Sequence, residues 1–402
     1  LLRGGCTEEE AIHLNGRSLM MLATGISAGF GCVLFPEGTS HNESSLLRFR
    51  TGPFRTVFAA AAIAKANDHP IPAVIPLGLH FRRRDHFRTD VWVEYDAPHY
   101  IQEDEIPNEL VQAVAKGNWV EPAAENVFAL RDALRIKMGP LTPNTRDWDE
   151  YHALHLLGHV EARRASQPLL SWRKEVEAAR VFRTLLQPKL PDEKIVENSE
   201  LPEITHPVFM PAKAVAGLLQ NNHLDGRDLN NSGTDLRRFN PVRGLTKLIR
   251  LPLLVAMLPL FLFCFLPQLA VGRLLGDSTD EGVDARTSYH FLAAMFGSLM
   301  FWPFMALGIM GIESMYHSSV ESILGFDWYL LFGTTSLHQI LAMVVFYLSL
   351  FPCFWFSGRT SALFWDDWCD FKQTIRRLRF NATNRQNLRG ALKILNEEMD
   401  KL

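Results

Sequence analysis

Three long apolar segments lie in the second half of the chain, and they constrain its fold more than any other feature. Residues 251–272, 291–312 and 328–358 contain no Asp, Glu, Lys or Arg. Each of the first two has about the 20 residues that a helix needs to cross ~30 Å of hydrocarbon. The third is longer, so we expect it to be tilted, broken or partly interfacial. A buried helical hairpin is the alternative, but three such segments in succession favour an integral membrane protein.

Basic residues flank this apolar region at both ends. Residues 237–250 and 359–379 are rich in Arg and Lys, whereas the connecting segments 273–290 and 313–327 are net acidic. Because basic residues accumulate on the cytosolic side, the preceding domain and the tail are both predicted to face the cytosol. In a eukaryote the membrane would be the endoplasmic reticulum. If the domain and the tail lie on the same side, the chain must cross the membrane an even number of times. One of the three segments is therefore expected to be re-entrant or interfacial.

The remaining composition argues against nucleic-acid binding and against a structural metal. The net charge of the 402 residues is −3, and no basic surface with interleaved aromatic residues is evident. The five cysteines are dispersed, which disfavours a disulfide framework or a zinc site. His152, His155 and His159 share one predicted helical face, but no carboxylate or thiol partner is evident. We therefore expect neither nucleic acid nor a metal as a partner.

An apolar run at residues 31–35 ends at Pro36 and leads into a polar turn that contains Glu37 and Gly38. This pattern predicts a buried strand with a carboxylate and a flexible glycine at its C-terminal end. In open α/β sheets, ligands bind at that edge. The alternation of elements around the run predicts an α/β fold. The expected elements are helices at residues 15–28 and 54–66 and strands at residues 73–81 and 90–95.

Farther along, the pattern changes from helical to irregular and then to apolar. The clearest helices are expected at residues 126–138 and 147–164, and a short one at 212–220. Two amphipathic helices in the tail could lie on a membrane or pack on the protein. We predict five segments: the α/β core (1–100), a helical extension (101–186), a linker (187–242), membrane helices (243–358) and an amphipathic tail (359–402).

Several short motifs resemble those of the PlsC-type glycerolipid acyltransferases. Phe35-Pro36-Glu37-Gly38-Thr39 is similar to the third sequence block of that family, and Val74-Ile75-Pro76 is similar to the fourth. The blocks occur in the family's order, within residues 1–160. The glycerol-3-phosphate or dihydroxyacetone-phosphate branch is closer still, because its members show motifs like Ser40-His41, Arg50-Thr51-Gly52 and Phe87-Arg88-Thr89-Asp90-Val91.

This resemblance implies transfer of a fatty acyl chain from acyl-CoA to the 1-hydroxyl of glycerol 3-phosphate or dihydroxyacetone phosphate. It implies no metal or redox cofactor, and acyl-CoA is a co-substrate. Glu37 would accept hydrogen bonds from glycerol hydroxyls, and Arg50 would bind phosphate with the amides of the following helix. The residues assigned to substrate binding are Arg3, Glu37, Gly38, Thr39, Ser40, Arg50, Thr51 and Gly52.

The catalytic block of the resembled family is an Asn followed by His-x-x-x-x-Asp, roughly 70 residues before Phe-Pro-Glu-Gly. Only 34 residues precede Phe35, and none of them fits the block. We therefore expect the catalytic His and Asp upstream of residue 1, and an acyltransferase domain that is incomplete at its N-terminus. Three later pairs have the right spacing but follow the Glu37 segment, so we expect no catalytic role for them. They are His80/Asp85, His99/Asp104 and His223/Asp228.

Three other functions remain open. The chain could acylate a lysophospholipid at the 2-position, or it could be a non-catalytic membrane scaffold that has kept the acceptor pocket. Gly25-Ile26-Ser27-Ala28-Gly29 matches the Gly-x-Ser-x-Gly motif of serine hydrolases. That motif requires a strand before the serine and a helix after it. The predicted order here is the reverse, so Ser27 is expected to be a residue at a helix end.

Overall fold

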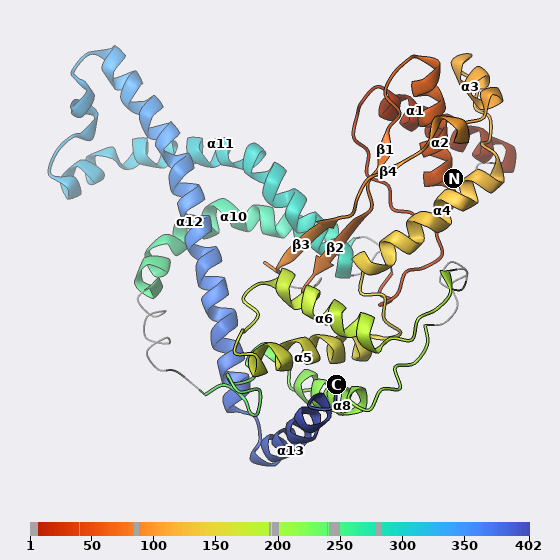
Figure 1. The fold of residues 1–402 in the computed structure, drawn as a ribbon. Coiled ribbons are helices and arrows are strands. Elements are labelled where there is room, and N and C mark those ends of the chain that lie inside the picture. The colour runs from red at the N-terminus through yellow and green to blue at the C-terminus, as the bar shows by residue number, and fades with distance from the viewer. Residues whose placement is uncertain are drawn as a thin grey trace. The chain divides into compact units, whose positions relative to one another are not determined.

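The computed structural model describes residues 7–39, 41–83, 88–192, 194, 201–238, 240, 250–278 and 283–402. Contacts divide the chain into two compact units, neither of which is continuous in sequence. The first unit comprises Leu1–Phe81, Val91–Leu236 and Asn381–Leu402, and the second comprises Arg82–Asp90 and Arg237–Phe380. Both are mostly helical, with only small sheets (Figure 1). The five segments proposed from sequence stay a prediction.

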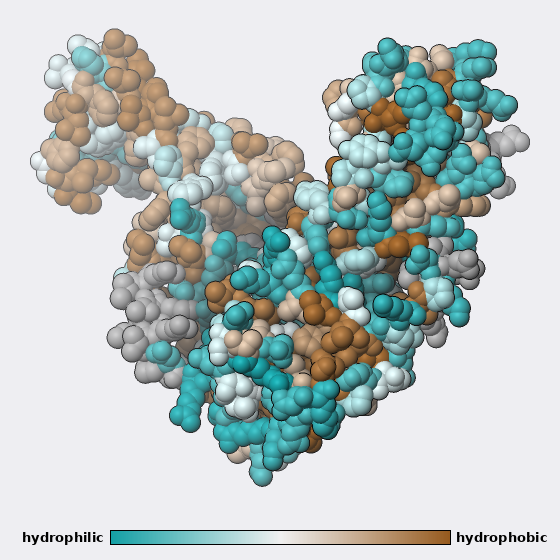
Figure 2. All heavy atoms as spheres, viewed as in Figure 1, coloured by the Kyte–Doolittle hydropathy of each residue, from teal (hydrophilic) through white to brown (hydrophobic). Residues whose placement is uncertain are grey.

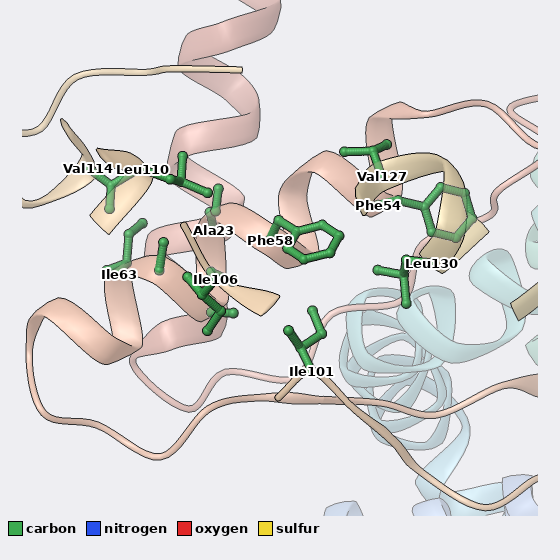
Figure 3. Packing of buried hydrophobic residues seen from close by; sticks show 14 of the residues in the cluster. Ala23, Phe54, Phe58, Ile63, Ile101, Ile106, Leu110, Val114, Val127 and Leu130 are labelled. Carbon is green, nitrogen blue, oxygen red and sulfur yellow. The ribbon is translucent and has the colours of Figure 1, made fainter. Parts of the chain in front are cut away.

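The N-terminal half of the first unit is built around a helix rich in alanine. Its Ala59, Ala60, Ala61 and Ala62 are fully buried, which lets neighbouring helices approach closely. Apolar residues from the surrounding helices and loops complete this core (Figure 3). The helices confirm the expected positions near residues 15–28, 54–66 and 126–138. The four helices of this part are α1 (Glu8–Ser27), α2 (Gly52–Ala66), α3 (Asn108–Ala115) and α4 (Ala124–Met138).

The strands form two separate antiparallel pairs rather than one parallel sheet. The first pair is β1 (Ala73–Val74) with β4 (His99–Tyr100), and the second is β2 (Leu77–Phe81) with β3 (Val91–Tyr95). The predicted strand at 73–81 is therefore interrupted before Leu77, and the one at 90–95 is confirmed. The α/β core expected for a PlsC-like acyltransferase domain is not confirmed, because no helix connects parallel strands among the described residues.

The prediction of a buried strand at residues 31–35 is wrong. Those residues belong to no strand, and the side chains of Val33 and Phe35 are 71% and 69% exposed. An apolar run becomes a buried strand only when another strand bonds to it and a layer covers it. Neither strand pair in the described part of the chain includes this run, so Glu37 does not lie at the edge of a sheet.

The second half of the first unit is a group of helices closed by the end of the chain. The N-cap side chains of Asp147 and Ser171 accept hydrogen bonds from the backbone at Glu150 and Lys174, which fixes the starts of two helices. The last helix, dark blue in Figure 1, packs against α8 and completely buries Leu388, Leu392 and Leu395. These helices are α5 (Trp148–Arg164), α6 (Trp172–Leu186), α8 (Phe209–Gln220) and α13 (Ala382–Met399).

The second unit contains three helices that are long and apolar enough to cross a membrane. Their outward side chains are largely apolar, as the brown spheres over α11 and α12 show (Figure 2). A small core around Cys264, Ala306 and Phe354 holds them together. These observations support the prediction of a membrane protein. The helices are α10 (Arg250–Asp277), α11 (Val283–Leu324) and α12 (Ser336–Leu378).

The third apolar segment continues into the tail without a break in the helix. α12 continues unbroken from Ser336 to Leu378, so the third apolar segment and the first predicted tail helix are one helix. Gly358 lies inside this helix and leaves room for the Phe265 ring, from which an added Cβ would lie 2.6 Å. Short 3-10 turns complete the fold: η2 (Glu103–Glu105), η3 (Gly139–Leu141), η4 (Gly226–Asp228) and η5 (Trp328–Phe332).

Candidate functional site

The Glu37 carboxylate closes part of the long loop that leads from α1 to α2. Its Oε1 atom accepts a hydrogen bond of 2.7 Å from the backbone N–H of Leu47, and its Oε2 atom lies 2.7 Å from Nε2 of His41. A further backbone bond of 2.7 Å runs from the N–H of Arg50 to the carbonyl oxygen of Pro36. The Glu37 side chain is only 18% exposed. Glu37 thus fixes the shape of the loop through both oxygens.

Gly38 and Arg50 are brought into contact by this closure, although twelve positions separate them in sequence. Gly38 has a φ of +68°, a region that glycine occupies without steric cost. A Cβ atom at Gly38 would lie 3.0 Å from Cγ of Arg50. The glycine therefore serves two purposes: it permits the turn, and it leaves room for the stem of the arginine.

Two arginines beside this turn are available to bind an anion. The side chains of Arg48 and Arg50 are exposed, and within the described residues neither guanidinium makes a hydrogen bond or an ion pair. Thr51 is the N-cap of α2 and makes no side-chain capping bond, and the first turn of the helix contains no acidic residue. Free amides and the helix dipole make such an end electropositive. The surroundings of Arg50 therefore favour an anionic ligand such as a phosphate.

Arg135 of α4 holds the same loop from the inside. It is 6% exposed, and its guanidinium donates hydrogen bonds to the carbonyl oxygens of Leu46, at 3.0 Å, and Leu47. The guanidinium also lies 5.2 Å from the centre of the Phe49 ring. Burial lowers the pKa of Arg135, and the nearby Glu37 carboxylate opposes that shift. Sequence reasoning missed Arg135, because nothing in the pattern of α4 marks it as buried.

Two side-chain bonds attach the first part of the loop to the start of α5. Nε1 of Trp148 donates a hydrogen bond of 2.8 Å to the carbonyl oxygen of Asn42. Oγ of Ser44, which is buried, donates one of 2.8 Å to the carbonyl oxygen of Thr145. Together with Arg135, these contacts support the loop at three points, so the positions of Arg48 and Arg50 depend on α4 and α5.

Only some of the other residues predicted for this site belong to the described part of the chain. Thr39 is exposed within the turn, and Thr51 and Gly52 lie at the start of α2 beside Arg50. Arg3 and Ser40 lie outside the described residues, as does Phe87 of the Phe-Arg motif. The structure therefore brings Glu37, Gly38 and Arg50 together.

His80, considered above as part of a catalytic pair, and Ser27, considered as a hydrolase nucleophile, both have hydrogen-bond partners within the fold. His80 is buried, and its Nε2 lies 2.9 Å from Oε2 of Glu94, whose carboxylate also accepts two hydrogen bonds from Arg180. Burial lowers the pKa of His80, with Glu94 opposing the shift. Asp85 lies outside the described residues. Ser27 ends α1 and donates its hydroxyl hydrogen to the carbonyl oxygen of Thr24, at 2.8 Å, so it is not placed on a nucleophile elbow.

The remaining histidines with suggestive spacing are dispersed. His99 belongs to β4 and Asp104 to η2, while His223 lies in the turn before η4, which contains Asp228. His159 is buried, with Nε2 at 3.2 Å from Oε2 of Glu175. In the ranges that the structure covers, no three His, Cys, Asp or Glu side chains are grouped to hold a metal ion.

Comparison with known proteins gives one match. The chain is 31% identical over 140 residues to glycerol-3-phosphate O-acyltransferase 2 of Saccharomyces cerevisiae, a match that covers 35% of this chain. The aligned stretch spans only 16% of that relative. No family model matches the chain. No solved structure matches it either.

Proposed function

We propose that this chain takes part in the transfer of a fatty acyl group from acyl-CoA to the 1-hydroxyl of glycerol 3-phosphate or dihydroxyacetone phosphate. In that reaction the hydroxyl oxygen attacks the thioester carbonyl carbon, the C–S bond breaks and the thiol of CoA leaves. The proton of the hydroxyl passes to a base. The proposal assigns no base to a residue of this chain; it assigns binding of the phosphorylated acceptor.

The pair of arginines beside the start of α2 is the observation that supports this proposal best. Arg48 and Arg50 present guanidiniums that no described residue neutralises, next to a helix start without a cap or an acid. A phosphate dianion fits such an environment, since an arginine and backbone amides can share its oxygens. The similarity to the yeast enzyme supports the same reading.

In this proposal Glu37 positions the site rather than reacting. Both of its oxygens already have partners within the loop, so its main effect is to place Gly38 and Arg50. Thr39 and Ser40 would add hydroxyl bonds to the glycerol moiety, Thr51 and Gly52 would offer the first amides of the helix, and Arg3 would add positive charge.

The membrane helices also support this function, because a long-chain acyl donor and its acylated product both partition into a bilayer. We place the first unit on the cytosolic side, at the endoplasmic reticulum in a eukaryote. This placement follows from the basic residues that flank the apolar region.

The test uses the product of the gene that encodes this chain, expressed in membranes that lack other acyltransferases of this kind. Labelled acyl-CoA is supplied with glycerol 3-phosphate, dihydroxyacetone phosphate or a lysophospholipid, and labelled products are separated. We expect acylation of one of the first two acceptors. Product only from the lysophospholipid would show a 2-acyltransferase instead, and the absence of any product would favour a scaffold.

Replacement of Arg50 tests the binding site within the same assay. We expect Arg50→Ala to raise the KM for the phosphorylated acceptor by about tenfold or more, as loss of a charged hydrogen-bonding partner implies. The KM for acyl-CoA should stay the same. Arg17→Ala is the matched control, because Arg17 is also exposed and lacks a partner among the described residues. Equal KM values for both variants would exclude Arg50 from the acceptor site.

A further inference from the structure

The ribbon formed by β2 and β3 has one face made entirely of apolar side chains. Its register places Leu77 opposite Tyr95, Leu79 opposite Val93, and Phe81 opposite Val91. Side chains of directly opposed residues lie on the same face of a sheet, so these six form one continuous surface. Four of them are well exposed: Leu79 is 42%, Val91 47%, Val93 40% and Tyr95 66% exposed.

The opposite face of the ribbon carries His80 and Glu94 beside Gly78 and Trp92, and it is the face that is covered. His80 and Glu94 point there; Glu94 accepts bonds from Arg180 of α6, and the carbonyl oxygen of His80 accepts one of 2.9 Å from Nε1 of Trp172. Arg180 also lies 5.8 Å from the centre of the Trp92 ring. An antiparallel sheet with one solvent-exposed face normally turns its apolar face to the core and its polar face to water. This ribbon covers the face with the charged pair and exposes the apolar face, so the exposed face is suited to an apolar environment.

The loop that joins the two strands is bonded to one of the long apolar helices. Residues 82–90 belong to the second unit, and the guanidinium of Arg88 donates hydrogen bonds of 3.0 and 2.9 Å to the carboxylate of Asp366 on α12. The loop contains four arginines and two aspartates, and it is therefore basic. Phe81 and Val91, the outermost apolar pair of the ribbon, directly flank this loop in the chain.

The part of α12 that holds Arg88 has the side chains of a membrane–water interface. Trp365 and Trp368 are 38% and 42% exposed on either side of Asp366. Nζ of Lys372 lies 5.5 Å and 6.0 Å from the centres of their rings. Tryptophans paired with basic residues are typical of the headgroup level of a bilayer. The loop of the ribbon is thus bonded to a segment that is suited to that level.

We propose that the exposed face of the ribbon, formed by Leu77, Leu79, Phe81, Val91, Val93 and Tyr95, docks on the surface of the lipid bilayer. Its apolar side chains enter the boundary between headgroups and acyl chains. The ribbon then holds the first unit at the membrane independently of the three long helices. This surface does not depend on the acyl-transfer proposal.

The test places a photoreactive benzoylphenylalanine at Val93 in the full chain, reconstituted in lipid nanodiscs. The nanodiscs contain phosphatidylcholine and phosphatidylserine with tritiated acyl chains. The matched control carries the same group at Val181, a valine of α6 that is 63% exposed. After irradiation we expect about tenfold more tritium on the chain labelled at Val93, as insertion at the headgroup–acyl boundary implies.

Equal labelling at the two positions would overturn the proposal, and so would a cross-link from Val93 to a second copy of the chain in place of lipid. A second variant guards against misfolding. With the reactive group at Val91, Leu79→Asp and Val93→Asp together should abolish lipid labelling while the circular dichroism and thermal unfolding of the chain stay unchanged. Persistent labelling in that variant would also contradict lipid docking.

Discussion

Glu37, His41 and Leu47 meet through a single carboxylate, and this contact gives the glutamate a structural role within the loop. The sequence motif predicts a carboxylate that reaches a substrate hydroxyl, whereas both of its oxygens are engaged within the loop. The structure does bring Gly38 and Arg50 of the motif into contact, and a turn glycine and an arginine before a helix are local signals. Arg135 and Trp148 could not be predicted, since they lie 88 and 106 positions from the carbonyl groups that they contact.

Gly38→Ala is expected to damage the site through geometry alone. The substitution strains a residue with φ of +68° and forces Cγ of Arg50 away from its present position. We expect a loss of about 1 kcal/mol in the free energy of unfolding, together with a raised KM for the phosphorylated acceptor. Chemical denaturation and acylation assays measure the two effects.

Gly25→Ala is the control for this variant. Gly25 lies inside α1, where an added Cβ would meet nothing within 4 Å. Alanine favours a helix over glycine, so we expect this variant to be as stable as the parent or slightly more stable. A destabilisation equal to that of Gly38→Ala would show that the effect is not specific to the turn.

At the scale of elements, helices were predictable and the pairing of strands was not. The spacing of apolar residues and the caps at Asp147 and Ser171 are local, so α5 and its neighbours follow from sequence. Residues 31–35 have the composition of a buried strand, but a strand needs a partner that the run itself does not specify. The length of α12 was missed because a change from apolar to charged residues does not break a helix.

The docking of α13 depends on Asp235. Its carboxylate accepts hydrogen bonds from Arg385 and Arg389 of that helix. Burial opposes ionisation of Asp235, but these bonds outweigh it and lower its pKa to about 2. A carboxyl with a lowered pKa stabilises the fold above its unfolded pKa of about 3.9, and this contribution is lost as the pH falls from about 4 to 2.

Asp235→Asn should therefore destabilise the first unit at neutral pH by about 1–2 kcal/mol, a modest value because both arginines are partly exposed. It should also remove part of the acid sensitivity between about pH 4 and pH 2. Unfolding followed at several pH values measures both effects. Glu397→Gln, at an exposed position of α13 where the carboxylate lies 3.9 Å from Nζ of Lys393, should change neither. A stability of Asp235→Asn equal to that of the parent would contradict this role of the ion pairs.

At the scale of the whole molecule, the position of α13 limits how the chain can cross a membrane. α13 belongs to the same compact unit as residues 91–236, although the three apolar helices lie between them in sequence. We therefore predict that both ends of the apolar region lie on one side of the membrane and that the number of crossings is even. One or all of the three helices would then not cross, which is also what the basic residues at both flanks predict.

Labelling from one side of the membrane tests this topology. In a variant without the native cysteines, Ser166→Cys and Lys401→Cys are expected to react with an impermeant maleimide from the same side of sealed vesicles. The native Asn381-Ala382-Thr383 sequon should carry no glycan if that side is cytosolic. Reaction of the two cysteines from opposite sides would mean that α13 does not join the first unit in a membrane.

The interleaving of the two units has a practical consequence for anyone who shortens this protein. A chain cut before α10 would lose α13 as well, and with it Leu388, Leu392 and Leu395, whose burial closes the face of α8. The truncated chain would expose the apolar face of α8 and aggregate during purification. A version without the three long helices needs the tail joined behind Leu236 through a short spacer, rather than a simple stop codon.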